Sequence, residues 1–310
     1  MRRAFGLTLL CCAALVARAE TYYVTVAGLG GEPDYEQRFA AWAGDLGKAL
    51  AKPAGAKSWV LSGKDATRER LRQVLAEIAG RAGENDALAV MLIGHGSFDG
   101  ADYKANLPGP DISAAELAEA LDRVPAGRQL VVNMTSASGA SIAALQRPRR
   151  AVITATKSGT ERNATVFARY WIEALNDPAA DSDKNEIVTA LEAFRYADQK
   201  TARFYETQKR LATEHPLLED TGAGEGVRTP SAENGQGLLA ARFPLLRLGA
   251  AAAEFSDPAR RKLRDRKEEL EQAIDKLKYE KAAMPLDEYK KQLTALLIEL
   301  AKTQAELDKR

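Results

Sequence analysis

The chain has 310 residues, with 44 Lys and Arg against 43 Asp and Glu, and 45% of its residues are hydrophobic. This length is consistent with about two domains, and the composition is that of a globular protein, which excludes wholesale disorder and a collagen-like chain. The near-neutral charge gives no electrostatic reason to expect a nucleic-acid partner.

The N-terminus has the pattern of a secretory signal segment. Two arginines follow Met1, residues 4–16 are almost all apolar, and Ala17-Arg18-Ala19 has the small-x-small form of a signal-peptidase site. The apolar run is too short to form a stable membrane-spanning helix. We therefore expect a signal peptide over residues 1–19 and a secreted or periplasmic protein that starts near Glu20.

Both cysteines of the chain, Cys11 and Cys12, lie in this segment. A lipoprotein site there is the weaker interpretation, because Leu10 or Cys11 precedes the cysteine where a small residue is expected, and a retained N-terminal anchor is the other alternative. Removal of the segment takes three arginines and no acid, which changes the formal net charge from +1 to −2. The exported protein would then have no disulfide, no Cys-ligated zinc site and no cysteine nucleophile.

Strands and helices are expected to alternate from residue 20 to about residue 215. Short apolar or β-branched runs predict strands at residues 22–26, 58–61, 87–93, 130–134 and 151–155. Helical spacing predicts helices at residues 34–50, 66–82, 113–121, 141–145, 164–175 and 190–213. Apolar strands that alternate with helices predict a parallel sheet covered on both faces, with the chemistry in the loops that follow the strands.

The C-terminal third divides into three segments. Residues 219–237 are rich in Gly, acidic and small polar residues, which predicts a flexible loop and a plausible nicking point. The apolar segment that follows, up to residue 256, has no clean period. Asp257-Pro258 begins a helix, Met284-Pro285 ends it, and a second helix carries an apolar seam of Leu286, Tyr289, Leu293, Leu296, Leu300 and Leu307. We expect a coiled-coil-like helical hairpin over residues 257–310, which packs on itself or the domain, or serves for self-association or docking.

Two strand ends carry side chains suited to catalysis. Residues 87–93 are followed by Gly94-His95-Gly96-Ser97, and residues 130–134 by Thr135-Ser136-Ala137-Ser138-Gly139. Neighbouring strands of a parallel sheet would bring the His95 imidazole near the Ser136 hydroxyl, and glycine turns would point N–H groups at a substrate. A base beside a hydroxyl with N–H groups for an oxyanion is the minimum for acyl transfer. The plainer interpretation is that His95 and Ser136 only cap strand ends.

These motifs resemble those of the legumain-type asparaginyl endopeptidases of the caspase-like clan. The resemblance runs from about Tyr22 to Leu218 and includes Gly28–Gly31, Ile93–Gly96, Thr135–Gly139 and Ala155–Gly159. It implies a caspase–haemoglobinase-like α/β fold, in which helices flank a mainly parallel sheet, here with the α-helical hairpin added. It implies catalytic places for His95 and Ser136 and an oxyanion hole from the backbone N–H groups of Gly96 and Ser136. The implied cleft is lined by Gly94, Thr135, Ser138, Gly139 and Thr156.

Ser136 stands where the family has its nucleophilic cysteine. A serine hydroxyl is far less acidic than a thiol and needs a general base held by a third group. The sequence shows no such carboxylate, since Asp99, Asp102 and Asp111 are candidates by proximity alone. The favoured interpretation is a non-catalytic module that binds a peptide or protein partner and requires no cofactor. The alternative is an active peptidase or amidohydrolase with Ser136 as nucleophile and His95 as general base.

An acidic loop gives a second, independent signal. Asp181, Asp183, Asn185 and Glu192 occupy positions 1, 3, 5 and 12 of a segment that resembles an EF-hand calcium loop. Position 6 should be Gly for a sharp turn, and here it is Glu186. The competing interpretation is that Thr189 and Glu192 form a capping box at the start of a helix, without any metal.

The second histidine of the chain, His215, precedes Pro216 at the end of a long polar helix. A lone histidine in this position is more often a helix-end feature than a ligand, so the sequence assigns it no role in a site. No stable membrane insertion is expected once the signal segment is removed.

Overall fold

A computed structural model describes residues 19–53, 55–249, 251–252 and 258–309. The expected signal segment before Ala19, both cysteines and Asp257 lie outside the described residues. No helix in the described part of the chain is long and apolar enough to cross a bilayer.

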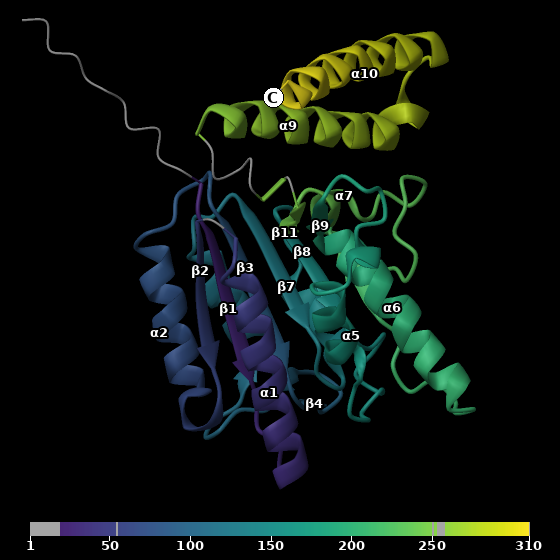
Figure 1. Ribbon diagram of the computed structural model, residues 1–310. Helices are drawn as coiled ribbons and strands as arrows, with labels where there is room; N and C mark the ends of the chain where they lie inside the picture. The colour runs from purple at the N-terminus through teal and green to yellow at the C-terminus, as the bar shows by residue number, and fades with distance from the viewer. Residues whose placement is uncertain (1–18, 54, 250, 253–257, 310) are drawn as a thin grey trace, which may run out of the picture.

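The fold is built on a six-stranded sheet with the order β10-β8-β7-β3-β1-β2 (Figure 1). Five strands are parallel, and β10 at one edge is antiparallel to β8. The six strands are β1 (Thr21–Ala27), β2 (Ala56–Leu61), β3 (Ala87–Ile93), β7 (Arg128–Asn133), β8 (Arg150–Thr154) and β10 (Leu217–Glu219). β3 and β7 are almost wholly buried because helices cover both faces, as expected for apolar strands of this kind.

Each face of the sheet has its own hydrophobic core. One core lies under α1 (Pro33–Leu50), α5 (Phe167–Ala174) and α6 (Ala190–Thr207), and the other under α2 (Arg68–Ala79), α3 (Ala114–Asp122) and α4 (Ile142–Leu145). α3 begins with the expected capping box, in which Ser113 and Glu116 satisfy each other's backbone N–H groups. These observations confirm the expected α/β class with a mainly parallel sheet between helices.

Several short elements were not expected from the sequence. A three-stranded sheet of β4 (Gly96–Phe98), β5 (Tyr103–Ala105) and β6 (Ile112–Ser113) follows β3, and β9 (Ile187–Thr189) pairs with β11 (Pro244–Arg247). Single 3-10 turns are η1 (Gly63–Asp65), η2 (Ser138–Ser141), η3 (Pro178–Ala180) and η4 (Lys281–Ala283). The five short strands β4, β5, β6, β9 and β11 are two to four residues long, which is too short to leave a clear alternating pattern in the sequence.

The segment 219–237, whose composition predicts a flexible loop, has buried polar contacts near both of its ends. The buried Asp220 carboxylate accepts hydrogen bonds from the amides of Gly237, Leu239 and Ala240, and so holds the start of α7 (Leu238–Ala241). The Gln236 side chain accepts a hydrogen bond from the Asp220 amide at 2.9 Å. Buried polar anchors therefore hold both ends of a segment whose composition alone indicated mobility. A separate difference concerns helix α6, which ends at Thr207, six residues before the expected end.

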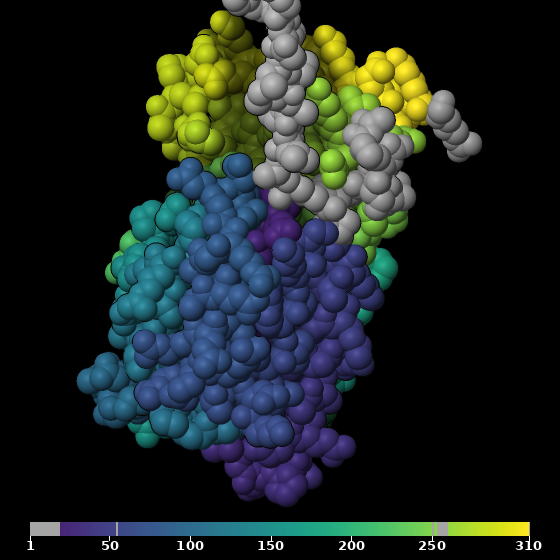
Figure 2. All heavy atoms as spheres, turned by 90° about the vertical axis from the view of Figure 1, so that its left-hand side faces the viewer, coloured from purple at the N-terminus to yellow at the C-terminus, as the bar shows by residue number. Residues whose placement is uncertain are grey.

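The C-terminal hairpin consists of α9 (Pro258–Glu280) and α10 (Leu286–Asp308), as the periodicity predicts. Figures 1 and 2 place it at one end of the domain, where β1 begins, with α9 against the domain and α10 outside it. Arg247 of β11 makes two hydrogen bonds to Glu268 of α9, at 3.0 and 2.8 Å, and the Tyr279 hydroxyl donates to the Gln236 carbonyl at 2.7 Å. One seam assignment is wrong: Leu286, in the first turn of α10, is exposed.

Candidate functional site

The strand order reverses between β1 and β3, since β2 lies on one side of β1 and all later strands of the sheet lie on the other. In open α/β sheets such a switch point, at the carboxyl ends of the strands, is the usual place for a ligand. Gly28 follows β1 and His95 follows β3, while Ser136 follows the next strand, β7. The ends of β3 and β7 are therefore neighbours, as the sequence predicts. We call the four loops at this end, residues 28–31, 94–100, 135–139 and 156–161, the carboxyl edge.

The His95 imidazole is half-buried against α1. Its ring makes edge contacts with the rings of Tyr35 and Phe39, with centroids 4.9 and 5.2 Å away. Burial lowers the His95 pKa below its usual value, and the nearby Gly30 carbonyl opposes that shift in part. A lowered pKa favours the neutral form of the imidazole.

Two of the three carboxylates near His95 in sequence have other partners. Asp99 accepts hydrogen bonds from the amides of Ala101 and Asp102, and Asp111 accepts one from the amide of Leu107. These bonds stabilise the turns of the β4–β6 region. The third group of a serine-type triad is therefore not supplied by Asp99 or Asp111.

Ser136 is 2% exposed, and its hydroxyl is held by the backbone of Gly96. The Gly96 amide donates to Ser136 Oγ at 3.1 Å, and Ser136 Oγ donates to the Gly96 carbonyl at 3.2 Å. Within the described residues these are the hydrogen bonds of this hydroxyl, so the His95 imidazole is not its partner. The Gly96 amide, expected as an oxyanion donor, is occupied by the hydroxyl that would have to attack.

Glycine is required where the loops of the carboxyl edge approach one another. A Cβ on Gly96 would lie 2.5 Å from the Ser136 carbonyl oxygen, and a Cβ on Gly139 would lie 2.3 Å from backbone atoms of Lys157 and Ser158. Gly94 has φ +146° and lies against Gly28. The expected role of these glycines in close backbone approach is thus seen, although the groups approached are loops of the protein itself.

The turn after β7 and the loop after β8 form one unit. Ser138 Oγ accepts hydrogen bonds from the amides of Ala155 and Thr156, both at 3.1 Å, and Thr156 Oγ1 accepts one from the Gly139 amide at 2.9 Å. Ala137 has φ +56°, a left-handed conformation that is unfavourable for a residue with a Cβ. Strain of this kind persists only where the surrounding contacts determine it, and it is common at functional loops.

Thr135 is buried in a separate polar cluster. Its Oγ1 lies 2.6 Å from the Tyr103 hydroxyl and 2.9 Å from Asn133 Oδ1. This cluster joins β5 to the end of β7. Thr135, expected to line a cleft, is held by these buried hydrogen bonds and borders a small pocket with Gly28 and His95.

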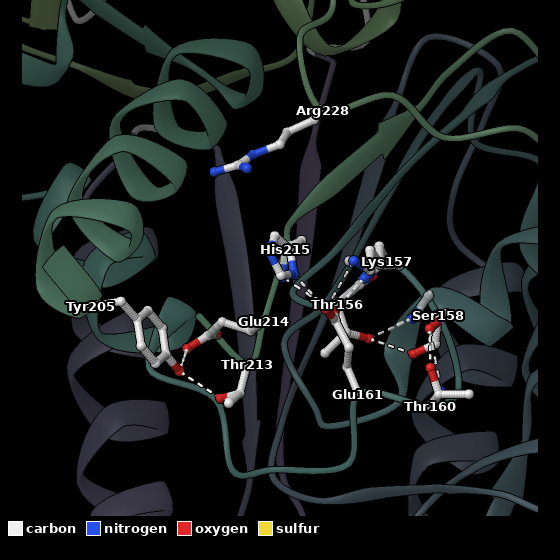
Figure 3. A network of polar contacts seen from close by, with 12 residues as sticks. Thr156, Lys157, Ser158, Thr160, Glu161, Tyr205, Thr213, Glu214, His215 and Arg228 are labelled. Atoms are coloured by element: carbon white, nitrogen blue, oxygen red, sulfur yellow. Dashed lines mark hydrogen bonds and ion pairs between the residues drawn. The ribbon is translucent and has the colours of Figure 1, made fainter. Parts of the chain in front are cut away.

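An acid–imidazole pair that the sequence did not indicate lies beside this unit (Figure 3). The His215 amide donates to Glu161 Oε2 at 3.2 Å, and His215 Nδ1 pairs with Glu161 Oε1. The carbonyl of Glu161 accepts the Ala137 amide at 2.7 Å, which connects the pair to the turn that holds Ser136. His215 precedes the antiparallel strand β10, and only that strand direction brings it to the carboxyl edge.

Glu214, next to His215, is a second buried acid of this region. Its carboxylate accepts hydrogen bonds from the amides of Val166 and Phe167 at the start of α5, at 2.8 and 3.1 Å, and from the Tyr205 hydroxyl at 2.9 Å. Burial raises its pKa to about 7, against the lowering effect of these bonds. Glu214 thus caps α5 and is expected to titrate near neutral pH.

The acidic loop lies beside the hairpin, at the other end of the domain from the carboxyl edge (Figure 1). Carboxylate oxygens of Asp181, Asp183 and Glu192 lie within 4.8 Å of one another. Glu186, in the place of the expected glycine, has φ +67°, and its amide donates to Asp181 at 3.0 Å. The expected capping box is also present, with Glu192 bonded to Thr189 through one oxygen and to Ser182 through the other. The clustered carboxylates and the capping box are therefore both present, so the two interpretations do not exclude each other.

A cavity of about 450 Å³ separates this loop from α9. Carboxylates line both of its sides, including Asp183 and Glu192 from the loop and Glu271 from α9. Partial desolvation beside the cavity, together with the charge of Glu192, raises the pKa of Asp183 to about 6. Burial raises the pKa of Glu271 to about 7; nearby Lys267 opposes this and Asp183 adds to it. Like charges thus face each other where the hairpin meets the domain.

No protein-family model matches the chain, and no curated protein matches its sequence. Among solved structures it is similar to a structural-genomics protein from Geobacter sulfurreducens, with 13% identity, a TM-score of 0.46 and coverage of 75% of this chain and 100% of that one. It is also similar to caspase-1 from Spodoptera frugiperda (14% identity, TM-score 0.46, 66% of this chain and 87% of that chain). The Drosophila initiator caspase Dronc gives 9% identity and a TM-score of 0.41, over 67% of this chain and 81% of that chain. Each is a distant likeness in fold, and none identifies the activity of this chain.

Proposed function

We propose that the protein is an exported, legumain-like peptidase homologue without a catalytic cysteine, which binds a peptide or protein partner at the carboxyl edge. One observation carries the proposal: the Ser136 hydroxyl is buried and bonded to both backbone groups of Gly96 rather than to the His95 imidazole. A serine nucleophile needs that imidazole to take its proton during attack. Hydrogen bonds join the loops around it into one unit, which supports a binding surface.

The rival function is a hydrolase in which Ser136 is the nucleophile and His95 the general base. The lowered pKa of the His95 imidazole, which favours the neutral form that a base needs, supports it. In this reaction Ser136 Oγ would form a bond to the carbonyl carbon while its proton moves to His95, and the amides of Gly96 and Ser136 would hold the oxyanion. The Ser136 hydroxyl would first have to leave the Gly96 amide and carbonyl.

A fluorophosphonate probe on the purified protein separates the two functions. The binding module predicts no covalent labelling of Ser136 and no peptide or amide turnover. The hydrolase predicts labelling that Ser136→Ala and His95→Ala both abolish. Ser97→Ala is the matched control, because Ser97 is exposed in the adjacent loop and should leave either result unchanged.

We also propose calcium binding, of low affinity, at Asp181, Asp183, Asn185 and Glu192. The clustered carboxylates and the left-handed backbone at Glu186, the place where an EF-hand loop needs glycine, support it. A cation there would offset the repulsion between Asp183 and Glu192, which adds to desolvation in raising the Asp183 pKa. Because the loop faces α9, the consequence would be a calcium-responsive contact between the domain and the hairpin.

A further inference from the structure

The outer helix of the hairpin carries apolar side chains on a side that α9 does not cover. Leu286, Leu297 and Ile298 are 56%, 48% and 50% exposed, and Leu293 and Leu300 beside them are only half-buried. Figure 1 shows α10 on the far side of α9 from the domain. Within the described residues, no other element packs along this side of α10. We call this exposed strip of α10 the outer face, made of Leu286, Lys290, Leu297, Ala301 and Asp308, with Leu293 at its border with the seam that packs on α9 and Ile298 at its other margin.

The outer face has a charge of opposite sign at each end. Lys290 and Asp308 are 18 residues apart, which is about five turns of an α-helix, so they lie on the same line along α10. Lys290 has no ion pair within the described part of the chain, and Asp308 is bonded there to the side chain of Gln304. In an antiparallel pair of α10 helices, Lys290 of one helix can therefore lie opposite Asp308 of the other.

We propose that the outer face binds a second copy of this chain, with the two α10 helices antiparallel about a two-fold axis near residue 299. This register places Lys290 of each copy opposite Asp308 of the other. It also places Leu297 opposite Ala301, and Leu293 at the level of Ala305, so apolar side chains meet on both sides of the two-fold axis. A shift of one residue in either direction loses the Lys290–Asp308 pairing.

The resulting assembly is a four-helix bundle made from two hairpins. Two helices alone leave one side of an apolar seam exposed, whereas four helices enclose it. Small residues such as Ala301 and Ala305 allow the two α10 helices to approach closely. The hairpin lies at the end of the domain where β1 begins, so the dimer would leave both carboxyl edges accessible. The inference is independent of the function proposed for Ser136.

Sedimentation equilibrium on the purified protein tests the proposal. We expect a monomer–dimer equilibrium that Leu297→Glu shifts to monomer, with the dimer dissociation constant raised at least about tenfold, because the variant buries an unpaired charge. Leu211→Glu is the matched control, since Leu211 is 91% exposed outside the hairpin and should leave the equilibrium unchanged. A monomer at every concentration would overturn the proposal.

A charge-reversal cycle tests the register and direction. Lys290→Glu and Asp308→Lys should each weaken the dimer by about three- to tenfold, because each creates two like-charge contacts. The double variant Lys290→Glu/Asp308→Lys should restore the dissociation constant. Both residues are exposed, so the variants should keep the circular-dichroism melting curve of the unchanged protein. This interface is contradicted if the single reversals leave the dimer dissociation constant unchanged, or if the double variant does not restore it.

Discussion

The Ser136 hydroxyl lies 3.1 Å from the Gly96 amide nitrogen and 3.2 Å from the Gly96 carbonyl oxygen, so the loop after β3 holds the residue that stands in the nucleophile position. The Ser136 hydroxyl thus accepts a hydrogen bond from the backbone amide of Gly96 and donates one to the carbonyl of the same residue. This contact leaves the side chain inaccessible, at 2% exposure.

We predict that a thiol placed at this position reacts slowly. In Ser136→Cys, burial and the Gly96 contact should keep the thiol protonated, so iodoacetamide should modify it at least about tenfold more slowly than the exposed thiol of Leu211→Cys. Labelling is measured on the peptides that contain each residue. Fast labelling that His95→Ala slows would instead show that the imidazole reaches this side chain.

The close approach of the two loops at Gly139 predicts a large loss of stability on substitution. Gly139→Ala should lower the free energy of unfolding by about 2 kcal/mol or more, because its Cβ would overlap backbone atoms of Lys157 and Ser158. Gly44→Ala, in open space within α1, should instead raise it by about 0.5–1 kcal/mol. Denaturant unfolding measures both, and equal effects would contradict the packing described.

Because the pKa of Glu214 is raised, we predict that the free energy of unfolding falls as the pH rises toward 7. Its pKa is raised by burial from the ordinary value to about 7, so the folded state binds the proton more tightly than the unfolded state does. The favourable contribution is complete below the unfolded pKa and is lost as the pH passes through about 7, on the order of 3 kcal/mol in all. Melting temperatures between pH 4 and 8 should decline less steeply for Glu214→Gln. Glu206→Gln, on the exposed side of α6, should keep the original slope.

The facing carboxylates at the hairpin predict a pH-dependent effect of Glu271. Glu271→Gln should raise the melting temperature at pH 8, where Glu271 and Asp183 are both ionised and repel each other. At pH 5, where the raised pKa keeps Glu271 protonated, the same substitution should have little effect. Glu280→Gln at the exposed end of α9 serves as the control. An effect of equal size at both pH values would exclude this repulsion.

Calcium should stabilise the protein if the acidic loop binds it. We expect millimolar calcium to raise the melting temperature, and Asp181→Ala to abolish the rise, because Asp181 also fixes the backbone of residues 185 and 186. Asp287→Ala, an exposed acid on α10, should leave the rise intact. If calcium leaves the melting curve unchanged, the loop is a turn closed by its own hydrogen bonds and its capping box.

Local signals in the sequence determined most of the secondary structure. The apolar runs gave the five parallel strands, Ser113 and Glu116 marked the start of α3, and the seam of α10 marked the hairpin, because each signal lies within a few residues of what it specifies. The adjacency of the loops that carry His95 and Ser136 followed from the alternation of strands and helices.

Only the tertiary structure decided which groups meet at the carboxyl edge. Gly96 and Ser136 are 40 residues apart and Glu161 and His215 are 54 apart, and no local pattern records either contact. The antiparallel direction of β10 brings His215 to this edge, and the loop after β3 turns the Ser136 hydroxyl toward backbone rather than imidazole. Those outcomes depend on how whole elements pack, which is a property of the folded chain and not of any segment within it.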